Sequence, residues 1–172
     1  PERERELSQR YLGFPEDLSF NEFRLLSPEI RRQVILRNPI IQTDSYNRTM
    51  EHLAGEDWDK EGVYVLQFRK GRFGYLIAAG IRDAVQSIAD IRITQPQLDF
   101  ARDYFQHVSG VPYFNPEKWE SVIQNHDGRI PIAIHGVKDG TAVLPGDPIL
   151  RVEGPNELVA HFEPYFHRIF YP

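Results

Sequence analysis

The stretch IPIAIHGVKDGTAVLPGDPILRVEGP, residues 130–155, decides the fold class of this 172-residue chain. Apolar and polar residues alternate along it, as expected for strands that bury one face. The sequences Lys138-Asp139-Gly140 and Pro145-Gly146-Asp147 interrupt the alternation with residues typical of tight turns. The stretch therefore predicts three short antiparallel strands.

Helical segments precede this strand block. Ser27 as N-cap, Pro28 at the first helical position and Pro39 as a stop predict a short helix. Further helices are predicted by capping signals over residues 43–55, 94–105 and 115–128, and a strand by β-branched and aromatic residues over 63–68. Helices followed by an antiparallel strand block indicate an α+β domain, with helices packed on a small antiparallel sheet.

Two segments carry less simple signals. Apolar residues recur at helical spacing in residues 75–90, so we expect a helix there, with Ala78-Ala79-Gly80 suited to close approach by another backbone. Residues 156–172 begin like a helix with Asn156 as its cap. Pro164 lies inside this segment and is expected to kink or break the helix.

The composition is that of an ordinary globular domain. With 41% hydrophobic and 26% charged residues, the chain can bury one core. The net charge of −5 argues against binding to nucleic acid or a membrane surface, and the absence of cysteine excludes disulfides and thiolate chemistry. No apolar run approaches the ~20 residues that span a bilayer, and the charged N-terminus is unlike a signal peptide, so the expected location is cytoplasmic.

Tyr46 and a basic turn are the candidate binding residues. Tyr46 lies beside Asp44 in the expected first turn of a helix, where an aromatic ring either packs or offers a stacking platform to a planar ligand. Arg69, Lys70 and Arg72 follow the expected strand and surround a glycine, which suits phosphate oxygens but also an ordinary basic turn. Neither standard glycine-rich nucleotide loop is present.

Three other groups give weaker signals. His161 and His167 are six residues apart, which puts them on different faces of a helix, so no metal site is expected. Lys138 occupies a predicted turn, as the modified lysine of lipoyl and biotinyl carrier domains does, although lysine is common in plain turns. The acidic residues of segment 56–61 lack the spacing of a calcium loop and are expected to be solvated.

Three blocks of sequence together resemble the nicotinate and nicotinamide phosphoribosyltransferases, which are type II phosphoribosyltransferases. TDSYNRTM (43–50) is similar to the family's TDxYxxTM signature, and FRKGRFGYLIAAGIRDAVQSI (68–88) to its FRK block. Residues 114–156 are similar to a family stretch that ends in PGxPILxVEG. The order and approximate spacing of the blocks agree, so the resemblance covers about residues 40–172.

The resemblance implies roles for four residues. Family enzymes join nicotinate or nicotinamide to phosphoribosyl pyrophosphate and release pyrophosphate. The tyrosine of the family's TDxY motif stacks on the pyridine ring in a neighbouring subunit's active site, a role that falls on Tyr46, with Asp44 nearby. The arginine of the FRK block lies close to the sugar phosphates, a role that falls on Arg69, with Lys70 beside it. A homodimer or a barrel-bearing partner subunit is therefore expected, and a magnesium requirement stays open.

The chain also departs from the family. There, an α/β barrel follows this region and supplies most phosphate-binding and catalytic groups, whereas this chain ends where that barrel should begin. We therefore expect no catalytic residue within the chain and no activity from it alone. The expected organisation is a helical extension at 1–39, an α+β domain at 40–155 and a helix leading toward the barrel at 156–172.

Two alternatives remain open from the sequence. One is a freestanding, non-catalytic binding or regulatory module descended from the family. The other is the nicotinamide-specific enzyme, although TDSYNRTM and PGDPILRVEGP favour nicotinate.

Overall fold

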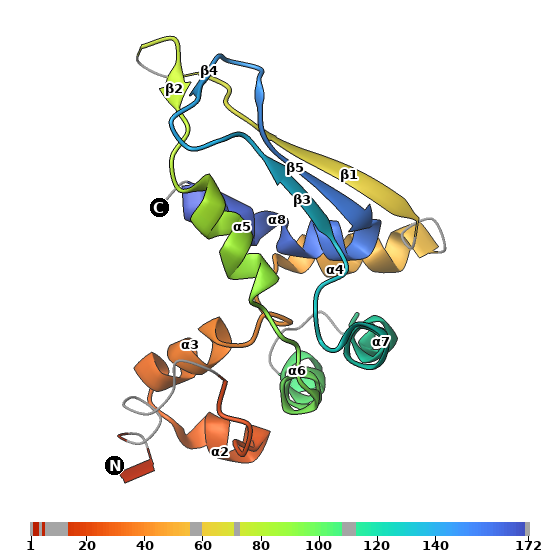
Figure 1. Ribbon diagram of the computed structural model, residues 1–172. Helices are drawn as coiled ribbons and strands as arrows, with labels where there is room; N and C mark the ends of the chain where they lie inside the picture. The colour runs from red at the N-terminus through yellow and green to blue at the C-terminus, as the bar shows by residue number, and fades with distance from the viewer. Residues whose placement is uncertain are drawn as a thin grey trace.

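Figure 1 shows the computed structural model of the chain, in which residues 2, 3, 5, 14–55, 60–70, 73–107 and 113–170 are described. Its helices are α2 (Phe20–Leu25), α3 (Pro28–Leu36), α4 (Ser45–Ala54), α5 (Ile81–Ala89), α6 (Gln95–His107), α7 (Pro116–His126) and α8 (Asn156–Phe170). Its strands are β1 (Glu61–Gln67), β2 (Leu76–Ile77), β3 (Ala133–Gly136), β4 (Ala142–Val143) and β5 (Pro148–Pro155). No helix among the described residues is long and apolar enough to cross a membrane.

The strands form a three-stranded antiparallel sheet in the order β1-β5-β3 and a separate antiparallel pair, β2-β4. The three strands predicted over residues 130–155 are β3, β4 and β5. The predicted fold class, α+β with a small antiparallel sheet, is therefore confirmed. β5 lies in the middle, where Val152 is opposite Tyr64 of β1 and Ile134 of β3.

One face of the three-stranded sheet is covered by helices. Both α5 and α8 lie on the same side of it, and α8 contacts β1 and β5 (Figure 1). Leu150 and Val152 of β5 are buried on this side, whereas Val63 and Val65 of β1 point to the opposite side and are about half exposed. The period of two along β1 thus separates a core face from an open face.

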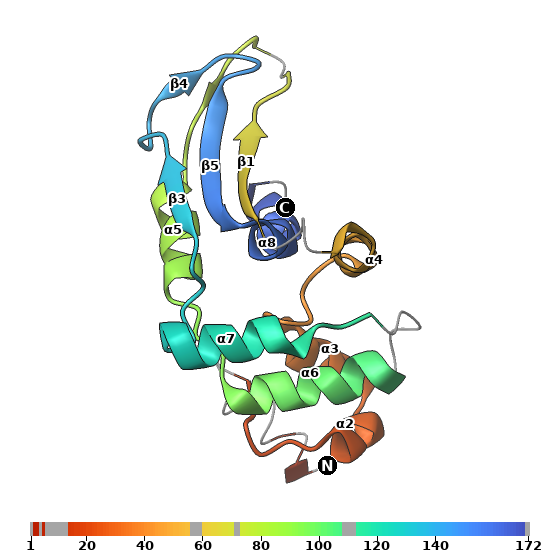
Figure 2. The same ribbon diagram turned by 90° about the vertical axis from the view of Figure 1, so that its right-hand side faces the viewer.

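A group of helices occupies the other end of the molecule. Figure 2 shows α2, α3, α6 and α7 gathered there, away from the sheet. Aromatic rings hold this group together: Phe100 of α6 meets Phe14 edge-on at 5.2 Å between ring centroids and Phe23 of α2 at 5.1 Å. Such edge-to-face contacts stabilise a core beyond the burial of apolar area.

Local capping signals place the helix ends correctly. In α7 the side-chain oxygen of Asn115 accepts a hydrogen bond from the amide of Glu117 at 3.0 Å, and Asp127 ends the helix in the left-handed conformation. Before α6 the side chain of Gln97 accepts from the amide of Thr94 at 2.9 Å, which is one of the two bonds of the predicted capping box. The reciprocal bond from the Thr94 side chain does not form, because its hydroxyl has no hydrogen-bond partner among the described residues. α3 likewise begins at Pro28 after Ser27.

The prediction of a helix over residues 75–90 is wrong for the first part of this segment. The helix begins at Ile81, and Leu76–Ile77 instead form β2, paired with β4. Gly80 separates the two elements with a φ of 76°, a conformation that favours glycine. The apolar residues of β2 satisfied a helical spacing by coincidence, because two-residue strands leave too little sequence for a period of two to be recognised.

Ala78, two residues before this glycine, meets another backbone as predicted. Its amide donates to the carbonyl of Thr141 at 2.8 Å, and its carbonyl accepts from the amide of Gly140 at 2.7 Å. In the same turn the side chain of Asp139 accepts a hydrogen bond from the amide of Ile81 at 2.8 Å. The Lys138-containing turn therefore caps the N-terminus of α5.

Of the kink or break predicted at Pro164, the break is wrong, because α8 is continuous from Asn156 to Phe170. An internal proline costs a helix about 3 kcal/mol. Phe162 and Phe166, on either side of it, are almost fully buried, and each such side chain contributes ~1.5–3 kcal/mol. Packing of α8 on the sheet therefore offsets the penalty.

Some predictions fall outside the described residues. They concern Gly71 and Arg72 of the basic turn and Glu56, Asp57 and Asp59 of the acidic segment.

Candidate functional site

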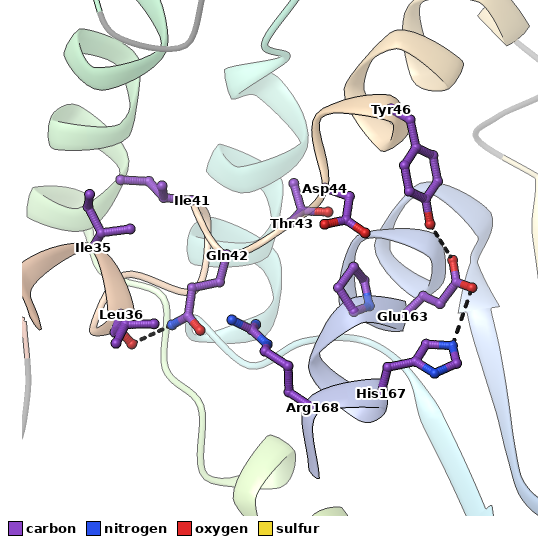
Figure 3. Close-up of a pocket in the computed structure, with 11 residues that line it drawn as sticks. Ile35, Leu36, Ile41, Gln42, Thr43, Asp44, Tyr46, Glu163, His167 and Arg168 are labelled. Carbon is purple, nitrogen blue, oxygen red and sulfur yellow. Dashed lines mark hydrogen bonds and ion pairs between the residues drawn. The ribbon is translucent and has the colours of Figure 1, made fainter. Parts of the chain in front are cut away.

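Tyr46 projects from the first turn of α4 toward α8. Its hydroxyl donates a hydrogen bond of 3.0 Å to Oε2 of Glu163 (Figure 3), and the residue is 46% exposed. Desolvation of the phenol, then the hydrogen bond and the charge of Glu163, raise the pKa of Tyr46 to about 12. The phenol therefore remains a hydrogen-bond donor at neutral pH, with an open aromatic surface.

The residues around Tyr46 explain why its ring faces outward. Asp44 is the N-cap of α4 and is exposed, whereas Asn47 and Arg48 are buried. The side-chain amide of Asn47 donates to the hydroxyl of Thr43 at 3.0 Å, and the guanidinium of Arg48 lies 4.1 Å from the centre of the Phe105 ring. Asn47 and Arg48 thus anchor α4 to the core, which leaves Tyr46 on the outer side of the turn.

Tyr46 lines a pocket of about 450 Å³. The wall is formed by the end of α3, the segment leading into α4, and the second half of α8 (Figure 3). Its lining residues are Ile35, Leu36, Ile41, Gln42, Thr43, Asp44, Tyr46, Glu163, Pro164, His167 and Arg168. Aliphatic, aromatic, anionic and cationic groups therefore face one space, which suits a small planar ligand with a polar edge.

Arg69 and Lys70 follow β1 and are both exposed. They line a second, larger pocket of about 830 Å³, together with parts of β1, the β2–α5 segment and α8. Glu163 and His167 line this pocket as well as the Tyr46 pocket. The two segments singled out from the sequence, 44–46 and 69–70, therefore lie on either side of the same pair of α8 side chains.

Sequence reasoning missed this contribution of α8. His167 Nε2 lies 3.6 Å from Oε1 of Glu163, one helical turn earlier, so the carboxylate contacts both Tyr46 and His167. A carboxylate and an imidazole at i and i+4 share a helix face, and this spacing was the available signal. His161, by contrast, is buried and faces the core, so the two histidines diverge as expected.

The weaker sequence signals do not converge on a site. Lys138 is exposed in its turn and is not among the residues that line the Tyr46 pocket or the Arg69 pocket. Within the part of the chain that the structure describes, no group of three or more histidine, aspartate or glutamate side chains could hold a metal ion.

An α+β domain with an outward tyrosine and an exposed basic turn on neighbouring pockets is compatible with a phosphoribosyltransferase N-terminal domain. The family model for the nicotinamide phosphoribosyltransferase N-terminal domain matches residues 38–134, more than half of the chain. The chain belongs to this family, and the resemblance seen in the sequence is confirmed.

Curated relatives agree with this assignment. The chain is 29% identical over 143 residues to nicotinate phosphoribosyltransferase 1 of Arabidopsis thaliana. This alignment covers 78% of this chain and 24% of the relative. It is 27% identical over 125 residues to nicotinate phosphoribosyltransferase of Dictyostelium discoideum, covering 70% of this chain and 20% of the relative. The chain thus spans about a quarter or less of the length of these relatives.

A solved structure shows the same fold. The crystal structure of human nicotinic acid phosphoribosyltransferase matches with a TM-score of 0.54 and 23% sequence identity. The match covers 74% of this chain and 25% of the human chain.

Proposed function

We propose that this chain is the N-terminal part of a nicotinate phosphoribosyltransferase, which joins nicotinate to phosphoribosyl pyrophosphate to make nicotinate mononucleotide for NAD synthesis. The observation that carries the proposal is the placement of Tyr46 and Arg69 on adjoining pockets in a chain that belongs to this family. Both side chains are open to a ligand or to another polypeptide.

The chemistry of the two segments supports this assignment. Tyr46 is an exposed aromatic residue, and such a ring can stack with an offset on a pyridine. The guanidinium of Arg69 and the ammonium of Lys70 can pair with phosphate oxygens, and arginine does so in bidentate fashion. A stacking ring and a phosphate-binding pair on two pockets that share Glu163 and His167 suit a substrate pair made of a pyridine and a sugar phosphate.

In the proposed reaction the pyridine nitrogen attacks C1 of the ribose, and the C1–oxygen bond to pyrophosphate breaks with both electrons leaving on pyrophosphate. Positive charge develops on the ribose in the transition state, so catalysis depends on alignment and on stabilisation of the leaving anion. Tyr46 would align the pyridine, and Arg69 would neutralise phosphate charge.

The remaining groups would come from another polypeptide or a further domain. Within the two pockets, Tyr46 is assigned to stacking and Arg69 and Lys70 to phosphate binding, and the proposal gives no described residue a catalytic role. We therefore propose a cytoplasmic homodimer or a complex with a barrel-bearing subunit, and no activity for the isolated chain. Nicotinate is favoured over nicotinamide because the curated relatives described above are nicotinate enzymes.

Formation of nicotinate mononucleotide from nicotinate and phosphoribosyl pyrophosphate tests this proposal. The 172-residue chain alone should be inactive, and the complete protein that contains it, or its complex with a barrel subunit, should be active. Nicotinamide should be a poorer substrate by kcat/KM. A complete protein that binds neither substrate would instead identify a non-catalytic module.

Tyr46→Ala is the decisive variant within that assay. Loss of a stacked aromatic pair, worth ~0.5–1.5 kcal/mol, should raise the KM for nicotinate by up to about tenfold. Leu25→Ala is the matched control, because Leu25 is a highly exposed hydrophobic residue of α2 outside both pockets. An unchanged KM in Tyr46→Ala would contradict the assigned role.

A further inference from the structure

Glu163 lies where the features of the candidate site meet. It lines the Tyr46 pocket, the Arg69 pocket and a third, small pocket of about 60 Å³ that residues of β1, β5 and α8 enclose. Its Oε2 accepts the hydrogen bond from Tyr46, and its Oε1 lies 3.6 Å from Nε2 of His167. The two carboxylate oxygens thus have different partners on two helices (Figure 3).

We propose that Glu163 is a positioning residue, whose carboxylate holds the phenol of Tyr46 and thereby sets the plane of the ring on which a pyridine substrate stacks. This inference rests on the proposed function, because it assigns Glu163 a role through Tyr46. It deepens that function by naming the group that prepares the stacking platform before the substrate arrives.

The ring of Tyr46 needs such an anchor. Tyr46 is 46% exposed as a residue, and the torsion that rotates a tyrosine ring about its Cβ–Cγ bond has a broad energy minimum. A hydrogen bond at the tip restrains both side-chain torsions, because the hydroxyl oxygen is the atom farthest from the backbone. A pre-oriented ring loses less freedom when the substrate binds, which favours binding.

Glu163 itself is held firmly enough to serve as the anchor. Its neighbours Phe162 and Phe166 are buried, with 2% and 5% of their surfaces exposed, and fix this part of α8 on the sheet. α8 also packs against α4, which carries Tyr46. The anchor and the ring therefore belong to elements with a defined mutual position, and a charged acceptor makes the stronger kind of hydrogen bond.

Steady-state kinetics of the complete phosphoribosyltransferase test the proposal. Tyr46→Phe removes only the hydroxyl, and Glu163→Ala removes its acceptor together with the contact to His167. Each should raise the KM for the pyridine by about fivefold. The double variant should be no worse than either single variant, because both break the same contact. The KM for phosphoribosyl pyrophosphate and kcat should change by less than about twofold.

Two further variants exclude a general effect of the substitutions. Glu163→Gln keeps an uncharged acceptor oxygen and should recover part of the loss seen in Glu163→Ala. Glu61→Ala removes an exposed carboxylate at the start of β1, outside all three pockets, and should leave both KM values unchanged.

The outcomes separate this inference from the proposed function. If Tyr46→Ala raises the pyridine KM while Tyr46→Phe and Glu163→Ala do not, the stacking role stands and the positioning role is wrong. If the KM increase of the double variant equals the product of the two single increases, positioning is also refuted. Such a product would show that Tyr46 and Glu163 act on substrate binding independently of each other. If Tyr46→Ala itself has no effect, the stacking role fails, and positioning fails with it.

The contact can be tested without activity in the 172-residue chain. With ¹³C-labelled tyrosine, NMR titration should give a Tyr46 pKa near 12 in the unmodified chain and a lower pKa in Glu163→Ala. An identical Tyr46 pKa in the two proteins would mean that the hydrogen bond is absent in solution, and this result would overturn the proposal.

Discussion

Nε2 of His161, in α8, lies 2.9 Å from the carbonyl oxygen of Pro39, although 122 positions separate the two residues. A carbonyl can only accept, so the ring carries its proton on Nε2. The imidazole is buried against Trp119, with ring centroids 4.7 Å apart, and desolvation followed by the charge of Lys118 lowers the pKa of His161 to about 3. The neutral imidazole thus joins α8 to the segment that ends the N-terminal helices.

This contact predicts a loss of stability in mild acid. Below the ordinary histidine pKa of ~6.5 the unfolded chain gains a proton at residue 161, whereas the folded chain does not until about pH 3. The free energy of unfolding should therefore fall as pH decreases through this window, by up to ~1.4 kcal/mol per pH unit from His161 alone.

Urea unfolding at pH 7, 6 and 5 measures that slope. His161→Gln should flatten it, since glutamine does not titrate, although the variant is less stable at pH 7. His135→Gln is the control, because His135 is exposed on β3. Equal slopes in His161→Gln and the unmodified chain would show that another group is responsible.

Loss of the Asn38 side chain is expected to lower the free energy of unfolding substantially. It is fully buried; its amide nitrogen donates to the carbonyl of Gln97 at 2.8 Å, and its oxygen accepts from the amide of Ile40 at 3.1 Å. Asn38→Ala leaves both backbone groups without this partner, so unfolding should become easier by about 1–3 kcal/mol. Asn125→Ala, on the exposed side of α7, should cost far less. Similar losses in both variants would contradict the role given to Asn38.

Substitution of Gly128 and of Gly140 by alanine separates the cost of a steric clash from the cost of a left-handed backbone. Both have positive φ, 71° and 87°, but a Cβ at residue 128 would lie 2.3 Å from the carbonyl oxygen of Ile93, whereas one at residue 140 would meet nothing within 4 Å. Gly140→Ala should cost the ~1–2 kcal/mol of a left-handed alanine. Gly128→Ala should cost several kcal/mol, because the Ile93 backbone must also move. Thermal denaturation of both variants measures the difference, and equal midpoints would refute the clash.

The basic segment predicts a substrate-specific defect. Arg69→Ala should raise the KM for phosphoribosyl pyrophosphate in the complete enzyme about ten- to hundredfold, as expected for lost hydrogen bonds to a charged group. Stability should change by no more than ~0.5 kcal/mol, because the side chain is exposed. Arg24→Ala, in α2, is the control. An unchanged KM in Arg69→Ala would remove Arg69 from the phosphate site.

The candidate site could be predicted only in part. Tyr46, Asp44, Arg69 and Lys70 were found because short motifs carry the family resemblance, and their roles in substrate binding stay predictions. Glu163 and His167 were missed because α8 lies about a hundred residues beyond these motifs. Its contact with Tyr46 is created by packing, and local sequence does not encode contacts at that separation.

The sequence by itself determined the elements whose signals are local. Pro28 begins α3, Asn115 and Asp127 bound α7, and alternating residues with turn signals marked β3, β4 and β5, because caps and turns act over a few residues. Only the tertiary structure decided that β4 pairs with β2, that α8 continues through Pro164, and that Tyr46 meets Glu163. These three outcomes depend on burial and pairing between distant segments, where the gain from packing outweighs local preference.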